Sequence, residues 1–277
     1  MILFNIVSLV ALASAILMLM LSQGASGLDR SLRFREASQA AVLARAGETS
    51  ATVALRRDAA EAPESDHLRE PWAKVIQRQA AIEGGTFTLT ITDAQSRFNL
   101  NNLGQGAVLT PTAAAPIAAA LQLDPALAER ISAAIRQGGP LQSLSQLRDF
   151  GVDEATLTRL SPLITLLPQP TPVNLNTASE DLITLMLGNA AAARMLVAQR
   201  QRAGYLTGAD LTSLGLFMPP GAGFTSSYYW VRTTVTIGDT PQTLTSLLSR
   251  SVRQGRPQVT TLGRWRGATA PDQALAP

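Results

Sequence analysis

Few side chains in this chain could support acid–base or nucleophilic chemistry. The 277 residues contain one histidine, His67, one lysine, Lys74, and no cysteine. His67 lies in a polar stretch between Asp66 and Arg69. An exposed loop histidine is the better interpretation there, because catalysis needs a base placed beside a nucleophile or a second carboxylate in a pocket. The sequence therefore predicts a protein that is not an enzyme.

Arginines could contact phosphate in one region. The segment VNLNTAS, at the start of residues 173–202, is followed by two helical stretches, as in helix-hairpin-helix DNA-binding modules. Arg194, Arg200 and Arg202 would be the phosphate contacts. The expected hairpin has one glycine, Gly188, instead of a Gly-apolar-Gly turn, and the net charge of +3 is mild. We favour arginines on a solvated helix face, and keep a membrane-anchored DNA-uptake receptor, with steeply salt-dependent binding, as the alternative function.

Asparagine is concentrated in two short segments. RFNLNNL contains Phe98 with Asn99, Asn101 and Asn102, and VNLNTAS contains Asn174 and Asn176. Asparagine readily hydrogen-bonds to nearby backbone and tolerates turns. We predict a structural role for RFNLNNL at a strand end, and keep a ligand-binding surface as the alternative.

The N-terminal region of the chain has the composition of a membrane anchor. Its first 21 residues are almost continuously apolar, and no charged residue precedes Asp29. About 20 helical residues cross the roughly 30 Å hydrocarbon core of a bilayer, so we predict a membrane helix. A cleaved signal peptide is the alternative, but it would start with basic residues. Helical spacing continues without proline to about residue 60, which predicts one helix of roughly 90 Å, with Gly24 and Gly27 favouring a bend or local melting.

Alternating apolar and polar residues predict strands in two separate regions. They are 86–93 before residue 108, and 224–239, 244–250 and 258–265 after residue 217, with a turn at Gly238-Asp239. We also predict a short helix over 72–81, and continued alternation over 96–103. The fold class is therefore α+β, with a long N-terminal helix packed on an antiparallel sheet.

The region between these strands, residues 108–217, has helical periodicity and many alanines. It contains a weak repeat with an offset of 64 residues: Arg130, Arg136, Leu147 and Gly151 recur as Arg194, Arg200, Leu211 and Gly215. Neither copy could bury its apolar face alone, so we expect paired helical hairpins. The sheet is thus interrupted by a large α-helical insertion.

Together these elements resemble the K family of type II secretion system minor pseudopilins. The resemblance is carried by the apolar N-terminal helix, Trp72, the segment Asp93 to Leu103 with its RFNLNNL motif, VNLNTAS, and the strands after Tyr228. It implies a pilin-like fold with these parts: 1–24 transmembrane, 25–60 the periplasmic continuation of the helix, 61–107 and 224–266 the αβ core, 108–223 the helical insertion, and 267–277 a disordered tail.

The resemblance also implies a function and a location. Family members are single-pass proteins of the bacterial inner membrane with a periplasmic C-terminal domain. They associate with the minor pseudopilins I and J, cap the tip of the pseudopilus and help to initiate its assembly for export of folded proteins. Further expected partners are the inner-membrane secretion platform, exported substrates and the secretin.

The resemblance assigns an assembly role to the start of the chain. The residues concerned are Met1, Leu3, Phe4, Asn5, Val7, Ala11, Ser14 and Ala15, and small residues among them allow close helix approach. Most pseudopilins have glutamate at mature position 5, where this chain has Asn5 if Met1 is the first mature residue. Family precursors carry a basic leader, cleaved before the N-terminus is methylated. No leader precedes Met1 here, so a mature chain, a late start and absent processing stay open.

Finally, the resemblance implies calcium as a candidate ligand. Hard-oxygen ligands exist in the predicted periplasmic part: Asp93, Asp149, Asp153 and Asp239. No twelve-residue EF-hand spacing is present. The four aspartates are therefore candidates without an assigned geometry.

Overall fold

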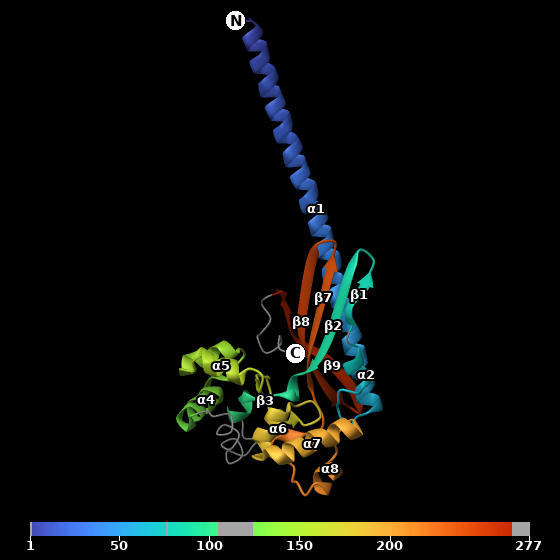
Figure 1. The fold of residues 1–277 in the computed structure, drawn as a ribbon, viewed down its shortest axis with the longest axis vertical. Helices are drawn as coiled ribbons and strands as arrows, with labels where there is room; N and C mark the ends of the chain where they lie inside the picture. Colours follow the sequence, from blue (N-terminus) through green and yellow to red (C-terminus); the bar gives the residue numbers. More distant parts are fainter. Residues whose placement is uncertain (1, 76, 105–123, 268–277) are drawn as a thin grey trace.

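The computed structural model describes residues 2–75, 77–104 and 124–267. Helix α1 (Ile2–Glu61) is one continuous helix of 60 residues, which confirms the predicted long helix. It is helical through Gly24 and Gly27, so local melting there is not found. The N-terminus lies at the far end of α1 from the other helices (Figure 1).

A five-stranded antiparallel sheet packs against the C-terminal half of α1 (Figure 1). Its order is β1-β2-β7-β8-β9. The strands are β1 (Gln77–Ile82), β2 (Gly85–Asp93), β7 (Tyr228–Ile237), β8 (Thr240–Arg253) and β9 (Arg256–Arg266). The predicted strands and the turn at Gly238-Asp239 are confirmed. Because β2 and β7 are neighbours, the chain between them leaves the sheet and returns beside its point of departure.

Alternation on β2 and β7 explains the contact with α1. Leu89 and Ile91 of β2 and Tyr229 and Val231 of β7 are buried in one cluster with Leu55 of α1. A second cluster joins other residues of α1, β7 and β8: Ala40, Ala44, Val235, Ile237 and Leu244. Small residues on α1 bring its backbone close to the sheet, while threonines of β2 point to the other face.

Two local predictions were wrong. The predicted helix over 72–81 is limited to α2 (Pro71–Lys74), and residues 77–82 form β1 instead. Pairing of β1 with β2 across a tight turn outweighs the helix propensity of this segment, which comes from its alanines, glutamines and arginine. The alternation predicted over 96–103 is replaced by the 3-10 turns η1 (Ala94–Ser96) and η2 (Leu100–Gly104) around the short strand β3 (Phe98–Asn99). Asn99 and Asn101 are as buried as Phe98.

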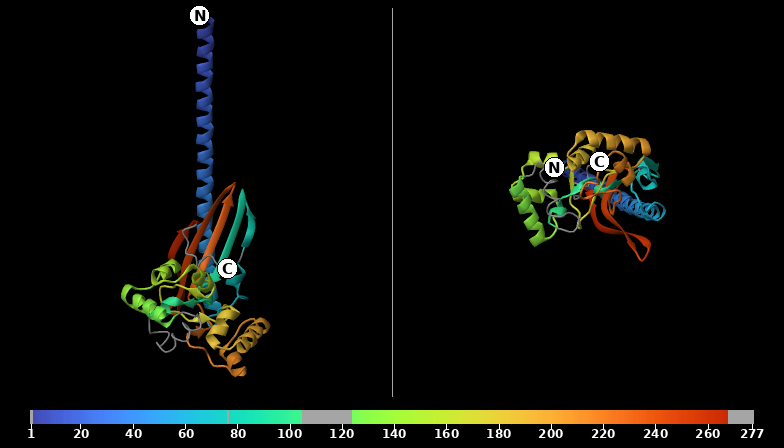
Figure 2. Two further views of the ribbon diagram at one scale, coloured as in Figure 1. Left: turned by 60° about the vertical axis from the view of Figure 1, so that its left-hand side comes forward. Right: turned by 90° about the horizontal axis from the view of Figure 1, so that it is seen from below.

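The segment between β2 and β7 forms helices and short strands at the end of the sheet remote from the N-terminus (Figure 2). They share one continuous apolar core that includes Phe98, Ile131, Leu147, Leu196 and Leu211. The elements are α4 (Pro125–Gly138), η3 (Leu144–Phe150), α5 (Glu154–Leu160), β4 (Ile164–Thr165), β5 (Val173–Asn174), α6 (Glu180–Leu187), α7 (Ala190–Ala203), α8 (Gly208–Ser213) and β6 (Ala222–Gly223).

Two parallel strand pairs divide this segment into two units. β3 pairs with β4, which brackets residues 98–165, and β5 pairs with β6, which brackets residues 173–223. The predicted repeat falls on matching elements of the two units. Leu147 and Leu211 are both buried, and Gly151 and Gly215 both end a helical turn at positive φ, 86° and 69°.

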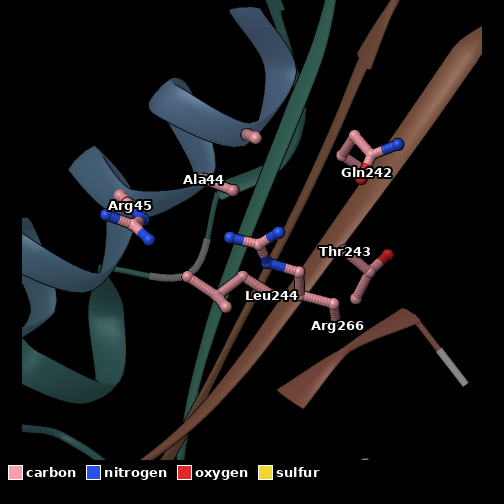
Figure 3. Close-up of a pocket in the computed structure, with 7 residues that line it drawn as sticks. Ala44, Arg45, Gln242, Thr243, Leu244 and Arg266 are labelled. Carbon is pink, nitrogen blue, oxygen red and sulfur yellow. The ribbon is translucent and has the colours of Figure 1, made fainter. Parts of the chain in front are cut away.

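The contact between α1 and β8 leaves almost no space. Ala44 and Arg45 of α1 face residues 242–244 of β8, with Arg266 entering from β9 (Figure 3). The cavity between them is about 20 Å³, enough for a single water molecule. This contact is therefore helix–sheet packing rather than a ligand site.

Gly47 tests how close this packing is. A Cβ at this position would lie 2.7 Å from the side chain of the buried Thr233. Helix propensity alone would make Gly47→Ala stabilising by about 1 kcal/mol, but overpacking costs roughly 1–3 kcal/mol. We expect Gly47→Ala to lower the free energy of unfolding, measured by chemical denaturation of the full chain in detergent.

The matched control is Gly27→Ala, because nothing lies within 4 Å of a Cβ at that position. It should leave the free energy of unfolding of the sheet and the helical units, which together we call the head, unchanged. A Gly47→Ala protein at least as stable as the unmodified chain would contradict the close contact.

Candidate functional site: the membrane helix and the buried polar junction

The first third of α1 presents its side chains outward. A stretch from Ile2 to Met20 is long and apolar enough to cross a membrane, and none of it is buried in the structure. The predicted assembly residues from Leu3 to Ala15 are all exposed; Met1 lies outside the described residues. Leu3, Val7, Ala11 and Ser14 share one face of the helix by their spacing. This part of α1 is thus available to lipid or to another helix.

At its other end, α1 joins a cluster of buried charges that we call the polar junction: Asp58, Asp66, Glu70, Tyr229 and Arg250. The Arg250 guanidinium donates to Asp58 Oδ2 at 2.9 Å and to Asp66 Oδ1. The Tyr229 hydroxyl donates to Asp66 Oδ1 at 2.8 Å, and its ring lies 5.0 Å from the guanidinium carbon. The junction ties the end of α1 and the following loop to β7 and β8.

Among the described residues, Arg250 forms ion pairs with two carboxyl groups of the polar junction, Asp58 and Asp66, whereas Glu70 has the His67 Nε2 atom at 3.5 Å. Burial raises the pKa of Glu70 to about 7, and the hydrogen bonds that its carboxylate accepts do not offset this. Burial raises the pKa of Asp58 to about 6, although Arg250 opposes the shift. Asp58, Asp66 and Glu70 each have at most 4% of their surface exposed. The junction therefore takes up protons near neutral pH.

The same three carboxylates are the one group among the described residues that could hold a metal, with ligand atoms within 4.8 Å of one another. Arg250 already occupies two of them. Glu70 Oε2 accepts from the His67 amide at 2.9 Å and from Trp72 Nε1 at 2.7 Å. The Arg250 guanidinium supplies the positive charge that a metal ion would otherwise supply, so the arrangement is an ion-pair network. Sequence reasoning missed it because its members are spread over 193 positions of the chain.

Asp93 is a second buried hub. Its Oδ1 accepts from the Gln95 amide at 2.8 Å, and its Oδ2 accepts from Asn174 Nδ2 at 2.9 Å, Thr177 Oγ1 at 2.6 Å and Ser226 Oγ at 2.6 Å. Burial raises the pKa of Asp93 despite these bonds. The hub joins the end of β2, the start of the second helical unit and the entry to β7.

The four aspartates considered for calcium do not fit a common site. Four hydrogen bonds fill the acceptor sites of Asp93. Asp149 and Asp239 are exposed on η3 and in the β7–β8 turn. Asp153 caps α5 by accepting from the Thr156 amide at 2.7 Å. Hydrogen bonds from the Thr156 side chain and then from its backbone lower the pKa of Asp153. None of them belongs to a cluster of metal-capable side chains in the described ranges.

The asparagines of RFNLNNL bind the backbone of the first helical unit and of the segment 166–172 that follows it. Asn101 accepts from the Leu141 amide at 2.8 Å and donates to the carbonyls of Leu141 and Leu167 at 2.9 and 3.0 Å. Asn99 accepts from the Leu167 amide at 3.1 Å, and Asn102 both donates to and accepts from Thr171. All three side chains bond backbone N–H and C=O groups that a neighbouring strand would otherwise bond, in a segment that has no long strand.

VNLNTAS does the same for the second helical unit. Asn176 accepts from the Leu206 amide at 2.6 Å and donates to its carbonyl at 3.4 Å, as Asn101 does with Leu141. Asn174 accepts from the Asn176 amide at 3.0 Å, as Asn99 does from Asn101. We call each Asn-Leu-Asn segment with its paired leucine an asparagine latch. The shared tripeptide was the signal of this equivalence, and sequence reasoning missed it.

The three arginines predicted to contact phosphate lie in different environments. Arg200 Nη1 donates to the carbonyls of Leu175 and Ala178, both at 2.7 Å, and so holds the second asparagine latch. Arg202 donates to the Gln199 side chain at 3.1 Å. Arg194 is exposed on α7. Since Arg200 is directed inward, the three do not form a phosphate-binding surface.

Glu48 is a further anchor of α1 that sequence reasoning missed. Its carboxylate accepts from Arg264 of β9, with the shortest contact at 2.7 Å, and from Ser246 of β8 at 2.6 Å. Burial opposes ionisation of Glu48, but these hydrogen bonds outweigh it and lower its pKa. An acidic residue in the middle of an otherwise small-residue stripe was the available signal.

Glu70→Gln tests the charge balance of the polar junction. The folded state binds a proton on Glu70 up to about pH 7, whereas the unfolded carboxyl titrates near 4.5. The stabilising effect of this proton is thus fully present below about pH 4.5 and is lost as pH rises to about 7, by on the order of 3 kcal/mol at 1.36 kcal/mol per unit. We expect Glu70→Gln to be more stable than the unmodified chain at pH 8, and near-equal at pH 4.5, in denaturation curves.

The control for Glu70→Gln is Glu129→Gln, at a side chain that is 75% exposed. It should give the same stability at both pH values, within about 0.5 kcal/mol. A Glu70→Gln protein less stable than the unmodified chain at pH 8 would show that the charged carboxylate is favoured.

Asn101→Ala tests the first asparagine latch. It removes one acceptor and two donors from buried backbone groups of Leu141 and Leu167, and unsatisfied groups cost about 1–3 kcal/mol each. We expect a loss of at least about 3 kcal/mol in the free energy of unfolding, followed by denaturant titration. Gln137→Ala, on the exposed face of α4, is the control and should change stability little. A loss below about 1 kcal/mol for Asn101→Ala would contradict the latch.

Comparison with known proteins relates this geometry to named relatives. No family model matches the chain. The chain is 27% identical to type II secretion system protein K of Pseudomonas aeruginosa over 247 residues, covering 74% of each protein. It is 30% identical to type II secretion system protein K of Klebsiella pneumoniae over 231 residues, covering 67% of this chain and 70% of the relative.

A solved structure has the same fold. One chain in the crystal structure of the GspK-GspI-GspJ complex of the enterotoxigenic Escherichia coli type 2 secretion system matches with a TM-score of 0.64 and 21% identity, over 86% of this chain and 99% of that chain. The match includes a mixed helical and antiparallel architecture, which confirms the predicted fold class. With 30% identity to a named relative over two thirds or more of both sequences, the chain belongs to the type II secretion system protein K family.

Proposed function

We propose that this family member is a minor pseudopilin that caps the tip of the pseudopilus and helps to start its assembly, with no catalytic role. The observation that carries the proposal is α1. Its first third is apolar, exposed and without acidic residues, while its last part is fixed to the head by Glu48 and the polar junction. Such a helix is suited to passing from lipid into a bundle of similar helices.

The partners in this proposal are the minor pseudopilins I and J. The solved relative of similar fold is part of a complex with GspI and GspJ. A neighbour could pack along the face of α1 that carries Leu3, Val7 and Ala11, because that side is exposed. The same role would bring the chain into contact with the secretion platform, and with exported substrates or the secretin.

The proposed location is the inner membrane, with residues 1–24 as the anchor and the head in the periplasm. In this arrangement the pilin-like core, 61–107 with 224–266, carries the insertion 108–223 at the end farthest from the membrane. The helical units are then placed where they can broaden the tip. The tail 267–277 lies almost entirely outside the described residues and is not assigned a role.

Asn5 supplies a test of the tip position. A carboxylate in hydrocarbon persists only where it is paired, so a subunit without one at position 5 is suited to an end of the fibre. We expect Asn5→Glu to reduce export of folded proteins and recovery of the complex with I and J from detergent-solubilised membranes. Secretion assays and co-purification of the full chain measure the two effects.

The control is Asn5→Gln, which keeps an uncharged amide at the same position. It should leave secretion and co-purification unchanged. Normal secretion together with normal complex formation in Asn5→Glu would argue against the tip role. Failure of the unmodified chain to co-purify with I and J would remove the partner assignment.

A further inference from the structure

We propose that a cavity at the C-terminal end of α1 binds a basic side chain, arginine or lysine, of a neighbouring protein. The site itself is argued from the described residues alone. That the neighbour is another pseudopilin subunit rests on the proposed function. We call this cavity the α1-end pocket.

The α1-end pocket lies between the loop that follows α1 and the second helical unit. Its volume is about 470 Å³, large enough for a side chain and its terminal charged group. One wall is the end of α1 and residues 62–65, and the other is the α7–α8 connection with Phe224. The lining is Glu61, Ala62, Pro63, Glu64, Ser65, Tyr205, Leu206, Thr207, Gly208 and Phe224.

The charge of this lining is negative. Glu61 and Glu64 are exposed acidic residues, and no arginine or lysine is among the lining residues. The C-terminal end of a helix carries a partial negative charge from its aligned peptide dipoles. No basic residue lies in the last turn of α1 to neutralise it. Arg69 lies beside this wall, with its guanidinium donating to the Gln201 carbonyl and close to Gly204. The two lining glutamates exceed it by one negative charge, so the pocket favours a cation over an anion.

An aromatic ring adds a second feature suited to a cation. Tyr205 is 40% exposed, and its ring is stacked on His67 with a centroid distance of 4.7 Å and an interplanar angle of 8°. Burial lowers the pKa of His67, so this neighbour adds no positive charge at neutral pH. Guanidinium and ammonium groups bind to tyrosine rings through the negative ring face.

The walls are held in place before any ligand arrives. The Leu206 amide donates to Asn176 at 2.6 Å, and the Thr207 hydroxyl and amide donate to Asp210 at 2.7 and 2.8 Å. The two walls are joined to each other, because the amide of Asp66, the residue after Ser65, donates to the Phe224 carbonyl at 2.8 Å. A pocket fixed in this way loses little conformational entropy on binding. Its shape comes from the second asparagine latch and the polar junction.

Titration with a single amino-acid probe tests the pocket without a partner protein. The full chain, labelled with ¹⁵N in detergent micelles, is titrated with N-acetyl-arginine amide and, separately, with the uncharged isostere N-acetyl-citrulline amide. We expect saturable shifts of the Thr207 and Gly208 amide signals with the arginine probe. The citrulline probe should bind roughly tenfold more weakly, because it lacks the charge.

Variants assign the effect to the lining. Glu61→Gln/Glu64→Gln should weaken arginine binding roughly tenfold, and Tyr205→Leu should weaken it several-fold. The matched control is Glu83→Gln/Asp239→Asn, which removes two exposed charges from the β1–β2 and β7–β8 turns; it should bind as the unmodified chain does.

Three outcomes would overturn the proposal: no saturable shift, equal binding of the two probes, or unchanged arginine binding in Glu61→Gln/Glu64→Gln. Failed co-purification with I and J would overturn the proposed function and leave a positive titration standing. Normal co-purification with a negative titration would overturn the pocket alone.

Discussion

One hydrogen bond closes the largest excursion of this chain. Asp93, at the end of β2, accepts from Ser226, just before β7, although the two residues are 133 positions apart. Both side chains are almost completely buried. Because β2 and β7 are adjacent strands, the segment that contains both helical units must leave the sheet and return to it at this one point. The sheet can form only if the two ends of the helical segment meet, and the Asp93 hub holds them together.

The asparagine latches extend the same principle into the helical units. Each unit starts with a two-residue strand that is too short to satisfy its neighbours through a ladder, so side-chain amides complete the backbone pairing. An amide matches a peptide group in donor and acceptor geometry. Buried networks of this kind specify one arrangement, since any other register would leave several polar groups without partners. Matching latches also indicate that the two units are variants of one structural design.

The elements that could be predicted from sequence are those whose pattern is local. The apolar run and the proline-free continuation predict α1, and alternation predicts β2 and β7. An element that is buried on one face has apolar residues at regular intervals in its sequence. β1 was missed because its residues, QRQAAI, form a strand only through pairing with β2. The polar junction was missed for a similar reason: Asp58, Asp66 and Arg250 meet only after the sheet has formed. The structural role predicted for RFNLNNL is consistent with its hydrogen bonds, whereas the predicted alternation was wrong because asparagine can be buried when it is fully bonded.

The attachment of α1 has a mechanical consequence. Glu36 accepts from Thr240 at 2.7 Å, Glu48 binds Arg264, and Asp58 binds Arg250, so polar anchors recur at intervals of about 15–18 Å along the helix axis. Tension applied at the apolar end would load all three anchors in shear, together with the small-residue contacts between them, instead of peeling them apart in succession. The sheet would then follow α1 as a rigid body when the helix is pulled along its axis.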